Sequence, residues 1–325
     1  MSKFRIGKFK LPDFRTGWWF YVAVAGVVIL LVLIVRSLIP APQRRPAPPV
    51  KLHGPVPEPT ISLYRVETGG KVWLKMEDYV AGVVAGEIDP TWPREALVAQ
   101  AIVARTFAMQ QYESGFKSRY GTDASSDITE FQAYKPDLIN DNVRAAVHAT
   151  RGQVLTYDGK IIRAYFHSCS GGITATAPEG MDFTAEPTPY LQPVRDGPCS
   201  DPREENWSAS FSVAEIAGAA GVSGFSAISI GERGPSGRAV TILLDSVPVK
   251  AVKLRAALDP TYRFRSTLIT DLRISGDRVY IAGKGWGHGV GLSQWGAHDR
   301  ALAGQTAAQI VTYYYPGARI EQLWK

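Results

Sequence analysis

The sequence predicts an α+β fold, and three features of the chain lead to this class. Residues 76–90 and 92–112 have the apolar spacing and the strong helix formers of two consecutive helices. Residues 226–282 alternate apolar and polar side chains like β-strands, with a turn at residues 234–237. Such a mixture of helices and strands favours a mixed α+β architecture over a wound parallel sheet.

The other predicted elements follow from turn and cap residues. Two short strands are expected within residues 61–75, on either side of Gly69-Gly70. Pro90 ends the first helix, and Pro93 begins the second at a first-turn position. Further elements are expected as a helix at 140–150, a hairpin at 153–166 that turns at Asp158-Gly159, a helix at 212–221, and helices at 293–303 and 306–315.

The N-terminal part of the chain predicts a membrane anchor. Residues 18–35 are an uninterrupted apolar run, which as a helix would span about 27 Å of bilayer. Five basic residues precede it, so the positive-inside rule places the N-terminus in the cytoplasm. An uncleaved signal anchor is favoured over a removed signal peptide, because the run is long and no small-residue cleavage site follows it directly. In either case the rest of the chain lies outside the cytoplasm.

The proline content of the residues after this apolar run predicts a spacer between the membrane and the folded domain. Eight prolines lie between positions 40 and 59, which predicts an extended and semi-rigid segment. The chain is therefore divided into a cytoplasmic basic tail (1–17), a transmembrane helix (18–36), a Pro-rich linker (37–60) and one extracytoplasmic domain (61–325).

The net charge of +6 does not predict a nucleic-acid-binding protein. Residues 1–45 contain eight Lys or Arg and a single Asp, a net charge of +7, so the remaining residues carry −1. The basic character belongs to the N-terminus and not to a patch on a folded surface. We therefore expect no nucleic-acid partner.

Glu87 is the candidate general acid. On a helix it shares the apolar face of Val83 and Val84. A carboxyl group near such a face and at a helix end is partly desolvated, which raises its pKa and keeps a proton on it near neutral pH. Such a group can act as a general acid. A solvated glutamate at a helix end is the alternative that the spacing leaves open.

Residues 283–291 carry glycine at every second position. In a strand this alternation leaves one face without side chains, so that another backbone or a flat ligand can approach closely. A tightly packed sheet corner is the alternative, although five glycines would weaken an ordinary strand. The other face of the strand would carry Lys284, Trp286, His288 and Val290.

The two cysteines, Cys169 and Cys199, leave three alternatives open. Outside the cytoplasm they would form a disulfide, which closes a loop of about thirty residues. His167 lies two residues before Cys169 and instead suggests a structural zinc site with both cysteines, for which His148 or Asp196 would supply the fourth ligand. Unpaired thiols are the third alternative.

Seven short motifs follow one another along the outer part of the chain. They are Y-V-A-G-V-V-A-G-E, E-A-L-V-A-Q-A-I-V-A-R-T-F-A, Y-F-H-S-C-S-G-G, P-Y-L, S-G-R-A, G-W-G-H-G-V-G-L-S-Q-W-G-A and Y-Y-Y-P-G. The sixth motif is long and specific, whereas the A-L-x-A-Q-A part of the second is weak. The ordered set, from about residue 60 to 320, resembles the stage II sporulation protein D family, which also includes the amidase enhancers.

This resemblance implies a lytic transglycosylase that cuts the glycan strands of peptidoglycan. The sporulation members of the family are membrane-anchored and act in engulfment of the forespore, on strands whose stem peptides an amidase has removed. The catalytic acid of the family matches Glu87. Further family positions near the site match Arg105, Tyr190, and Tyr314 or Tyr315.

One carboxyl group suffices for this chemistry, whereas a glycoside hydrolase normally needs two. The C6 hydroxyl of muramic acid attacks its own anomeric carbon and gives a 1,6-anhydro sugar, while Glu87 first protonates the leaving oxygen and then takes the hydroxyl proton. Arg105 is expected to face the substrate, because a cation against Glu87 would lower the pKa of that carboxyl. Trp286, His288 and Gln294 are expected to line the glycan groove, and a purely structural role for His288 stays open.

The reaction requires no cofactor, and the zinc alternative gains support because some sporulation relatives bind zinc near this histidine and cysteine. The expected partners are peptidoglycan, the membrane, a cell-wall amidase and other sporulation membrane proteins. The alternative function is a non-catalytic protein that binds glycan and stimulates an amidase. A zinc amidase is disfavoured, because the chain has no H-E-x-x-H pattern and its five histidines are scattered.

Overall fold

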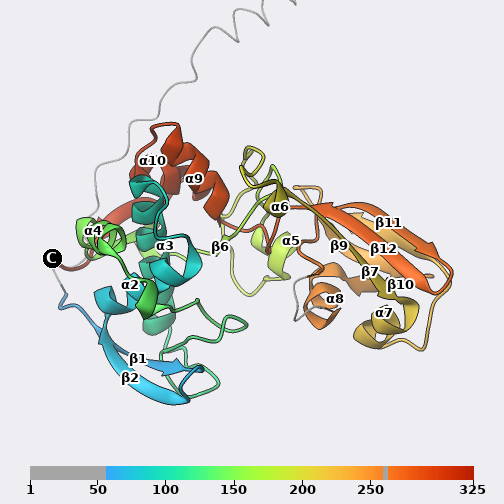
Figure 1. Cartoon of the computed structure of the whole chain (residues 1–325), viewed down its shortest axis with the longest axis horizontal. Helices are drawn as coiled ribbons and strands as arrows, with labels where there is room; N and C mark the ends of the chain where they lie inside the picture. Colours follow the sequence, from blue (N-terminus) through green and yellow to red (C-terminus); the bar gives the residue numbers. More distant parts are fainter. Residues whose placement is uncertain (1–55, 259–262) are drawn as a thin grey trace, which may run out of the picture. The chain divides into compact units, whose positions relative to one another are not determined.

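The structure of the chain is a computed structural model that describes residues 56–258 and 263–325. Its helices and strands are drawn in Figure 1. Their buried apolar side chains form two hydrophobic cores. The first core draws on residues 61–191 and 290–324, so both ends of the described chain contribute to it. The second core draws on residues 207–281. Both cores combine helices with strands, which confirms the predicted mixed α+β class.

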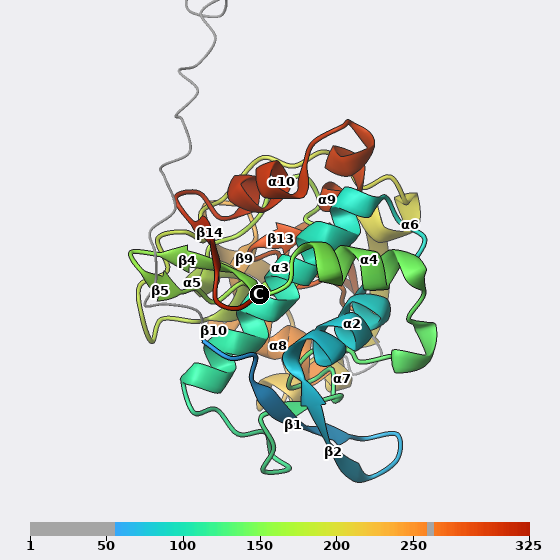
Figure 2. The same cartoon turned by 90° about the vertical axis from the view of Figure 1, so that its left-hand side faces the viewer.

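Three helices form the centre of the first core (Figure 2). All residues of α2 from Tyr79 to Ala85 are buried, so this helix is surrounded by protein on every side. Gly82 allows Tyr134 to lie against α2, because a Cβ at this position would be 2.2 Å from the tyrosine ring. All three helices were predicted from the sequence, and they are α2 (Met76–Glu87), α3 (Arg94–Glu113) and α4 (Asp141–Ala149).

Short strands border these helices in small sheets. The first hairpin turns at Gly69, which has a φ of +68°. The second turns at Asp158 and Gly159, as predicted, but its pairing ends at Ile161 and does not continue toward residue 166. The sheets have the orders β2-β1-β3 and β14-β4-β5, formed by β1 (Thr60–Arg65), β2 (Gly70–Lys75), β3 (Ala124–Ser125), β4 (Gln153–Tyr157), β5 (Lys160–Ile161) and β14 (Arg319–Gln322).

The second core lies among two three-stranded sheets and two helices. Strands are present in most of the described part of residues 226–282, as predicted, but residues 263–268 form no strand and residues 251–258 form a helix. There Leu254 and Leu258 are buried in the core from one face of a run of helix formers. The elements are β7 (Asn206–Ser212), α7 (Val213–Ala220), β8 (Ile228–Arg233), β9 (Ala239–Leu244), β10 (Val247–Lys250), α8 (Ala251–Leu258), β11 (Ile269–Ser275) and β12 (Arg278–Lys284).

The C-terminal part of the chain returns to the first core. Helices α9 (Gln294–Leu302) and α10 (Ala307–Tyr314) both pack on α3 (Figure 2). Ser293 and Thr306 cap them, because each side chain accepts a hydrogen bond from a backbone N–H of the first turn. The remaining short elements are η1 (Pro136–Leu138), β6 (Phe166–His167), α5 (Ala177–Met181), α6 (Pro202–Glu205) and β13 (Leu292–Ser293), which pairs in parallel with β6.

The basic tail, the transmembrane helix and most of the Pro-rich linker, as predicted for residues 1–60, lie outside the described residues. Within residues 56–258 and 263–325, no helix is both long enough and apolar enough to span a bilayer.

Candidate active site

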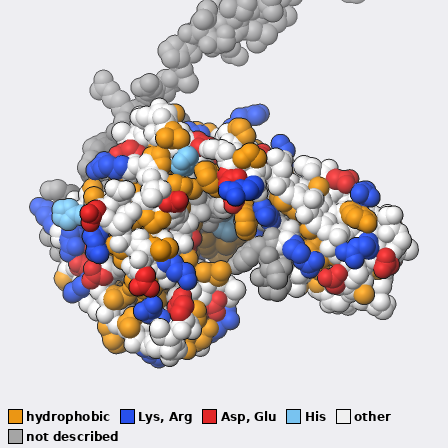
Figure 3. All heavy atoms as spheres, in the orientation of Figure 1, with side chains coloured by type: hydrophobic (Ala, Val, Ile, Leu, Met, Phe, Trp, Pro, Cys, Tyr) orange, Lys and Arg blue, Asp and Glu red, His pale blue; other side chains and the backbone are white. Residues whose placement is uncertain are grey.

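A pocket of about 520 Å³ gathers residues from distant parts of the sequence. It is bounded by the C-terminal end of α2, one face of α3, residues 128–133, β6, α8 and the glycine-rich segment. Figure 3 shows a hollow in the surface with a histidine side chain inside it. The pocket brings together five of the residues singled out from the sequence, Glu87, His167, Trp286, His288 and Gln294.

Glu87 is the last residue of α2 and lines this pocket. The preceding Val83 and Val84 are fully buried, so the carboxyl group projects from an apolar helix face. Burial raises the pKa of Glu87 to about 7, and two groups offset only part of this rise. They are the Ala133 N–H and the Gln294 amide, which influences the carboxyl group without forming a hydrogen bond of ordinary geometry. The Ala133 N–H donates to Oε1 over 2.6 Å. Near neutral pH this carboxyl group can therefore either give or take a proton.

Two amide side chains beside Glu87 have unused donors. The Nε2 atoms of Gln132 and Gln294 are buried, and neither finds a hydrogen-bond acceptor of ordinary geometry among the described residues. The Oε1 of Gln132, in contrast, accepts a hydrogen bond of 3.1 Å from the Tyr79 hydroxyl, which fixes its orientation. A buried donor without an acceptor costs about 1–3 kcal/mol. Both amides can donate to the hydroxyl or carbonyl oxygens of a bound ligand.

His288 is a neutral part of the wall. Burial, together with the nearby charge of Arg255, lowers the pKa of His288 to about 3. Its Nδ1 accepts a hydrogen bond of 3.0 Å from the Val290 N–H, so the ring proton of the neutral form is on Nε2. Burial also lowers the pKa of His167 well below its usual range. Neither histidine can act as the acid at neutral pH.

The glycine-rich segment is not the strand that its alternation predicts. Strand β12 ends at Lys284, and the next four alternate glycines all have φ between +73° and +108°. Only glycine adopts such a backbone without strain. The bare positions also allow close contact, because a Cβ on Gly289 would be 2.4 Å from the Arg238 guanidinium and one on Gly291 would be 1.9 Å from the Tyr165 carbonyl oxygen.

The side chains of this segment that were expected to share one face lie in different surroundings. Trp286 and His288 line the pocket, whereas Val290 is fully buried in the first core. Lys284 is exposed, and its Nζ lies 3.7 Å from a carboxylate oxygen of Glu205. The conformation of alternating positive φ sends these side chains in different directions.

Arg105 does not reach the pocket, although it was expected to face the substrate. Its side chain has no exposed surface, and its Nη2 lies 2.6 Å from Oε2 of Glu77 at the start of α2. Oε1 of Glu77 also accepts hydrogen bonds of 2.9 Å from the Gly152 N–H and the Trp324 indole. A buried guanidinium requires such a partner. Arg105 therefore joins α3 to α2 and to the C-terminal residues.

The tyrosines expected near the substrate are buried as well. The Tyr190 hydroxyl accepts a hydrogen bond of 3.1 Å from the Arg163 N–H. The Tyr314 hydroxyl donates to Asp196 over 2.8 Å, and that of Tyr315 accepts from the Leu292 N–H over 3.2 Å. The hydrogen bonds of these hydroxyls join chain segments to one another. None of the three tyrosines lines the pocket.

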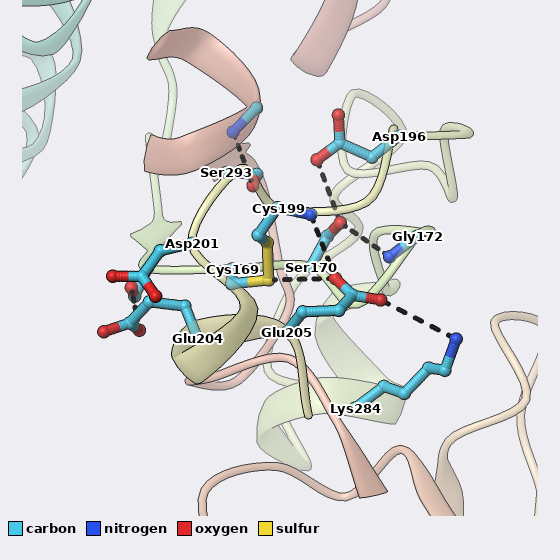
Figure 4. The surroundings of a disulfide bond; sticks show 12 residues. Cys169, Ser170, Gly172, Asp196, Cys199, Asp201, Glu204, Glu205, Lys284 and Ser293 are labelled. Carbon is cyan, nitrogen blue, oxygen red and sulfur yellow. Dashed lines mark hydrogen bonds and ion pairs between the residues drawn. A yellow bond between two sulfur atoms is a disulfide. The ribbon is translucent and has the colours of Figure 1, made fainter. Parts of the chain in front are cut away.

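Cys169 and Cys199 form a disulfide with a Cα–Cα distance of 6.2 Å (Figure 4). The Oε2 of Glu205 lies 3.6 Å from the Cys169 sulfur and accepts a hydrogen bond of 3.0 Å from the Cys199 N–H. His167 is not part of this cluster. Because the two sulfurs are bonded to each other, they are not the thiolates that zinc requires, and the proposed set of one histidine and two cysteines does not fit a zinc ion.

The disulfide is connected to the pocket through the backbone. Cys169 and Trp286 exchange two backbone hydrogen bonds, of 3.1 Å and 2.8 Å. The Ser168 carbonyl also accepts a hydrogen bond of 3.0 Å from the Trp295 N–H at the start of α9. The covalent cross-link thus supports the part of the glycine-rich segment that carries Trp286.

Residues 128–133 supply pocket residues that sequence reasoning missed. Glu130 places a second carboxylate in the lining, and its Oε1 accepts a hydrogen bond of 2.6 Å from the Arg119 N–H. Phe131 packs edge-on against Phe107 of α3 at 5.1 Å between ring centroids. These residues have no helical or strand periodicity and match none of the motifs, so nothing in the sequence singled them out.

Comparisons with known proteins agree on one family. A family model described as "Stage II sporulation protein" matches residues 66–157, which include Glu87. The chain is 30% identical over 279 residues to "Stage II sporulation protein D" of Bacillus subtilis, an alignment that covers 81% of this chain and 79% of that protein. It is 31% identical over 294 residues to the protein of the same name from Bacillus amyloliquefaciens, with 85% and 82% covered.

A further relative carries a different name. The "Amidase enhancer" of Bacillus subtilis is 28% identical over 295 residues, which cover 74% of this chain but only 40% of that longer protein.

Proposed function

The chain belongs to the stage II sporulation protein D family, and we propose that it is a lytic transglycosylase of peptidoglycan. Its substrate is a glycan strand stripped of stem peptides (stripped glycan), and its product ends in a 1,6-anhydro-muramic acid. The observation that carries this proposal is the carboxyl group of Glu87, whose pKa is raised to about 7 by burial in the wall of a 520 Å³ pocket.

In the first half of the proposed reaction, Glu87 acts as a general acid. Its proton passes to the glycosidic oxygen, and the bond between this oxygen and the anomeric carbon of muramic acid breaks. In the second half, the C6 hydroxyl oxygen of the same sugar bonds to the anomeric carbon, and the hydroxyl proton passes to the carboxylate of Glu87. The residue ends as it began, and no water is consumed.

The rest of the pocket suits a sugar chain. Gln132 and Gln294 offer buried amide donors for sugar hydroxyls, and each gains an acceptor that it lacks among the described residues. Trp286 offers an indole, a side chain on which sugar rings stack. His288 stays neutral, so it adds a polar wall without placing a cation beside Glu87 that would lower the pKa of the acid.

We further propose that residues 18–36 anchor the chain in the cell membrane, with the N-terminus in the cytoplasm. Residues 37–60 would then space the domain of residues 61–325 away from the bilayer, on the outer side. The disulfide between Cys169 and Cys199 supports this location, because such bonds persist in oxidising compartments. A cell-wall amidase that strips the glycan would be a functional partner, either in sporulation or in general wall remodelling.

The test compares full-length wild-type protein with Glu87→Gln and Glu130→Gln on stripped glycan and on intact peptidoglycan, with products identified by mass spectrometry. Wild type is expected to release anhydro-muramic ends, and Glu87→Gln to lose about 10²–10⁴-fold of this activity. Glu130→Gln is expected to keep the anhydro product. Reducing ends that depend on both glutamates would instead establish a two-carboxylate hydrolase.

The similarity to the amidase enhancer supports a second candidate, a glycan-binding protein that stimulates an amidase without cutting glycan. Under this alternative the wild type and Glu87→Gln would bind glycan equally, release no product, and accelerate a cell-wall amidase to the same extent. Anhydro ends from purified wild-type protein alone would exclude it.

A further inference from the structure

A second pocket, of about 440 Å³, lies along β7, which is an edge strand of its sheet. Three of the residues that line it are arginines, Arg203, Arg263 and Arg265, and among the described residues of its lining none is acidic. Asn206 and Ser208 are exposed on the same strand and add polar groups. We call this feature the arginine pocket. Its lining favours an anionic ligand that also carries hydroxyl groups.

Two of the arginines make ion pairs at the exposed surface, and Arg263 also donates a hydrogen bond of 3.4 Å to the Ser210 carbonyl oxygen. Arg203 lies 2.6 Å from Asp201 with 87% of its side chain exposed, and Arg263 lies 3.4 Å from Glu215 with 46% exposed. Exposed pairs of this kind contribute little to stability, so a bound anion can share or replace them at small cost. Arg263 is also held over the ring of Phe211, at 4.4 Å from its centroid, which keeps its guanidinium in place.

The third arginine connects this pocket to the candidate active site. The guanidinium of Arg265 lies 4.1 Å from the ring centroid of Trp286, a residue of the active-site wall. The Arg265 carbonyl also accepts a hydrogen bond of 2.9 Å from the Gly287 N–H. The two pockets are therefore neighbours across Arg265 and Trp286. A linear polymer that is bound at Glu87 and continued past Trp286 would come next to Arg265.

Peptidoglycan glycan offers a matching anion only after its peptides are gone. Each muramic acid carries a lactyl carboxyl group, which is an amide while the stem peptide is attached. Amidase cleavage frees it as a carboxylate, so stripped glycan carries one negative charge per disaccharide. The planar fork of arginine binds carboxylates through two parallel hydrogen bonds.

We propose that the arginine pocket binds the lactyl carboxylates of stripped glycan and thereby makes the protein prefer stripped strands over intact peptidoglycan. This inference rests on the proposed function, because it takes the occupant of the neighbouring active site to be the same glycan strand. It assigns the preference to a site that is distinct from Glu87 and outside the active-site wall.

The experiment measures binding and not cleavage, with full-length protein that carries Glu87→Gln so that no strand is cut. Arg203→Gln and Arg263→Gln are added together, and Arg265 is left unchanged because it contacts Trp286. The matched control adds Arg273→Gln and Arg278→Gln, which remove two exposed charges from β11 and β12 of the same sheet without touching the pocket lining. Fluorescence anisotropy follows the binding of end-labelled stripped glycan several disaccharides long.

The pocket variant is expected to bind stripped glycan at least about tenfold more weakly than its parent, while the control binds like the parent. The affinity of the pocket variant should also depend less on salt concentration, because two exposed charges no longer contribute. Glycan whose carboxyl groups have been converted to methylamides should bind the parent and the pocket variant with the same reduced affinity.

Two results would overturn the inference. One is equal binding of stripped glycan by the pocket variant and the control. The other is a combination of two findings: poly(glycerol phosphate) displaces glycan from the parent, and methylamidation of the glycan leaves its affinity unchanged. That combination would mean that the arginines bind wall phosphates. A folded parent that binds no glycan in any form would instead refute the proposed function, so the two failures are distinguishable.

Discussion

The two ends of α2 hold glutamates in contrasting surroundings. Glu77 at the start is 8% exposed, and Arg105 together with two further N–H donors surrounds its carboxylate. Glu87 at the end has one backbone donor and no ion pair in the described structure, and burial raises its pKa to about 7. The residue type and the helix are the same, so the surroundings decide the roles. A compensated carboxylate holds the fold together, whereas an uncompensated one keeps a proton available for chemistry.

The largest effect is expected at the compensated end. Glu77→Gln leaves the guanidinium of Arg105 buried without its counter-charge, and should lower the free energy of unfolding by about 3–5 kcal/mol. Urea unfolding measures this loss. The activity of the fraction that remains folded should be unchanged, because neither residue lines the active-site pocket.

Two variants control this result. Arg94→Gln breaks an exposed ion pair on the next helix and should cost no more than about 1 kcal/mol. Adding Arg105→Met to Glu77→Gln should recover part of the lost stability, because it removes the uncompensated charge. If Glu77→Gln instead kept its stability and lost activity, Arg105 would act on the substrate, as the family resemblance implied.

A smaller effect is expected from the uncompensated end, and it depends on pH. The pKa of Glu87 is about 7 in the folded chain, against about 4.3 for an unperturbed glutamate. Between these values the folded state holds a proton that the unfolded state has lost. The free energy of unfolding should therefore decrease as the pH rises from about 4.3 to about 7, and this contribution should stay constant above.

Glu87→Gln removes this dependence of the free energy of unfolding on pH. At about pH 8 the variant should therefore be more stable than wild type by about 1–3 kcal/mol. This value is smaller than the pKa difference alone would give, because the carboxyl group is partly exposed. Wild-type kcat/KM should fall above about pH 7, where the acid loses its proton. Unfolding curves and initial rates between about pH 5 and pH 8 measure both. Parallel stability profiles for the two proteins would contradict a raised pKa.

Of the two glutamates, only Glu87 had surroundings that could be predicted from the sequence. Periodicity placed Glu87 on an apolar face of a helix, and the structure has both the helix and the raised pKa. The partner of Arg105 could not be predicted, because Glu77 lies on another helix and Trp324 comes from the far end of the chain. Helical spacing indicates which face of a helix is apolar, but it does not indicate which distant residue will pair with a buried charge on that helix.

The backbone conformation of the glycine-rich segment could not be predicted from its sequence. Alternation was interpreted as a strand, but alternate glycines also permit a backbone of repeated positive φ, which the sequence pattern does not distinguish. The prediction of close packing on the bare positions was correct, and that of one common face was wrong. The loop of residues 128–133 gave no signal at all, although it supplies Glu130 and Gln132 to the pocket.

The smallest effect is expected from Gln294→Leu, which changes the surroundings of Glu87 and leaves its carboxyl group in place. This change removes a buried amide whose nitrogen finds no acceptor among the described residues, so stability should stay within about 1 kcal/mol of wild type or rise. The side chain of Gln294 lowers the pKa of Glu87, and its loss should move the alkaline limb of the activity profile to higher pH. KM for stripped glycan should rise about fivefold to tenfold, because a donor to the sugar is lost.

Gln100→Leu is the matched control for this change. Gln100 is also buried, and both polar atoms of its amide lack partners among the described residues, but it lies on α3 away from the pocket lining. It should match Gln294→Leu in stability and wild type in both KM and pH profile. If both variants left the alkaline limb and KM unchanged, Gln294 would be an ordinary buried amide, and the proton on Glu87 would depend on burial and the Ala133 N–H alone.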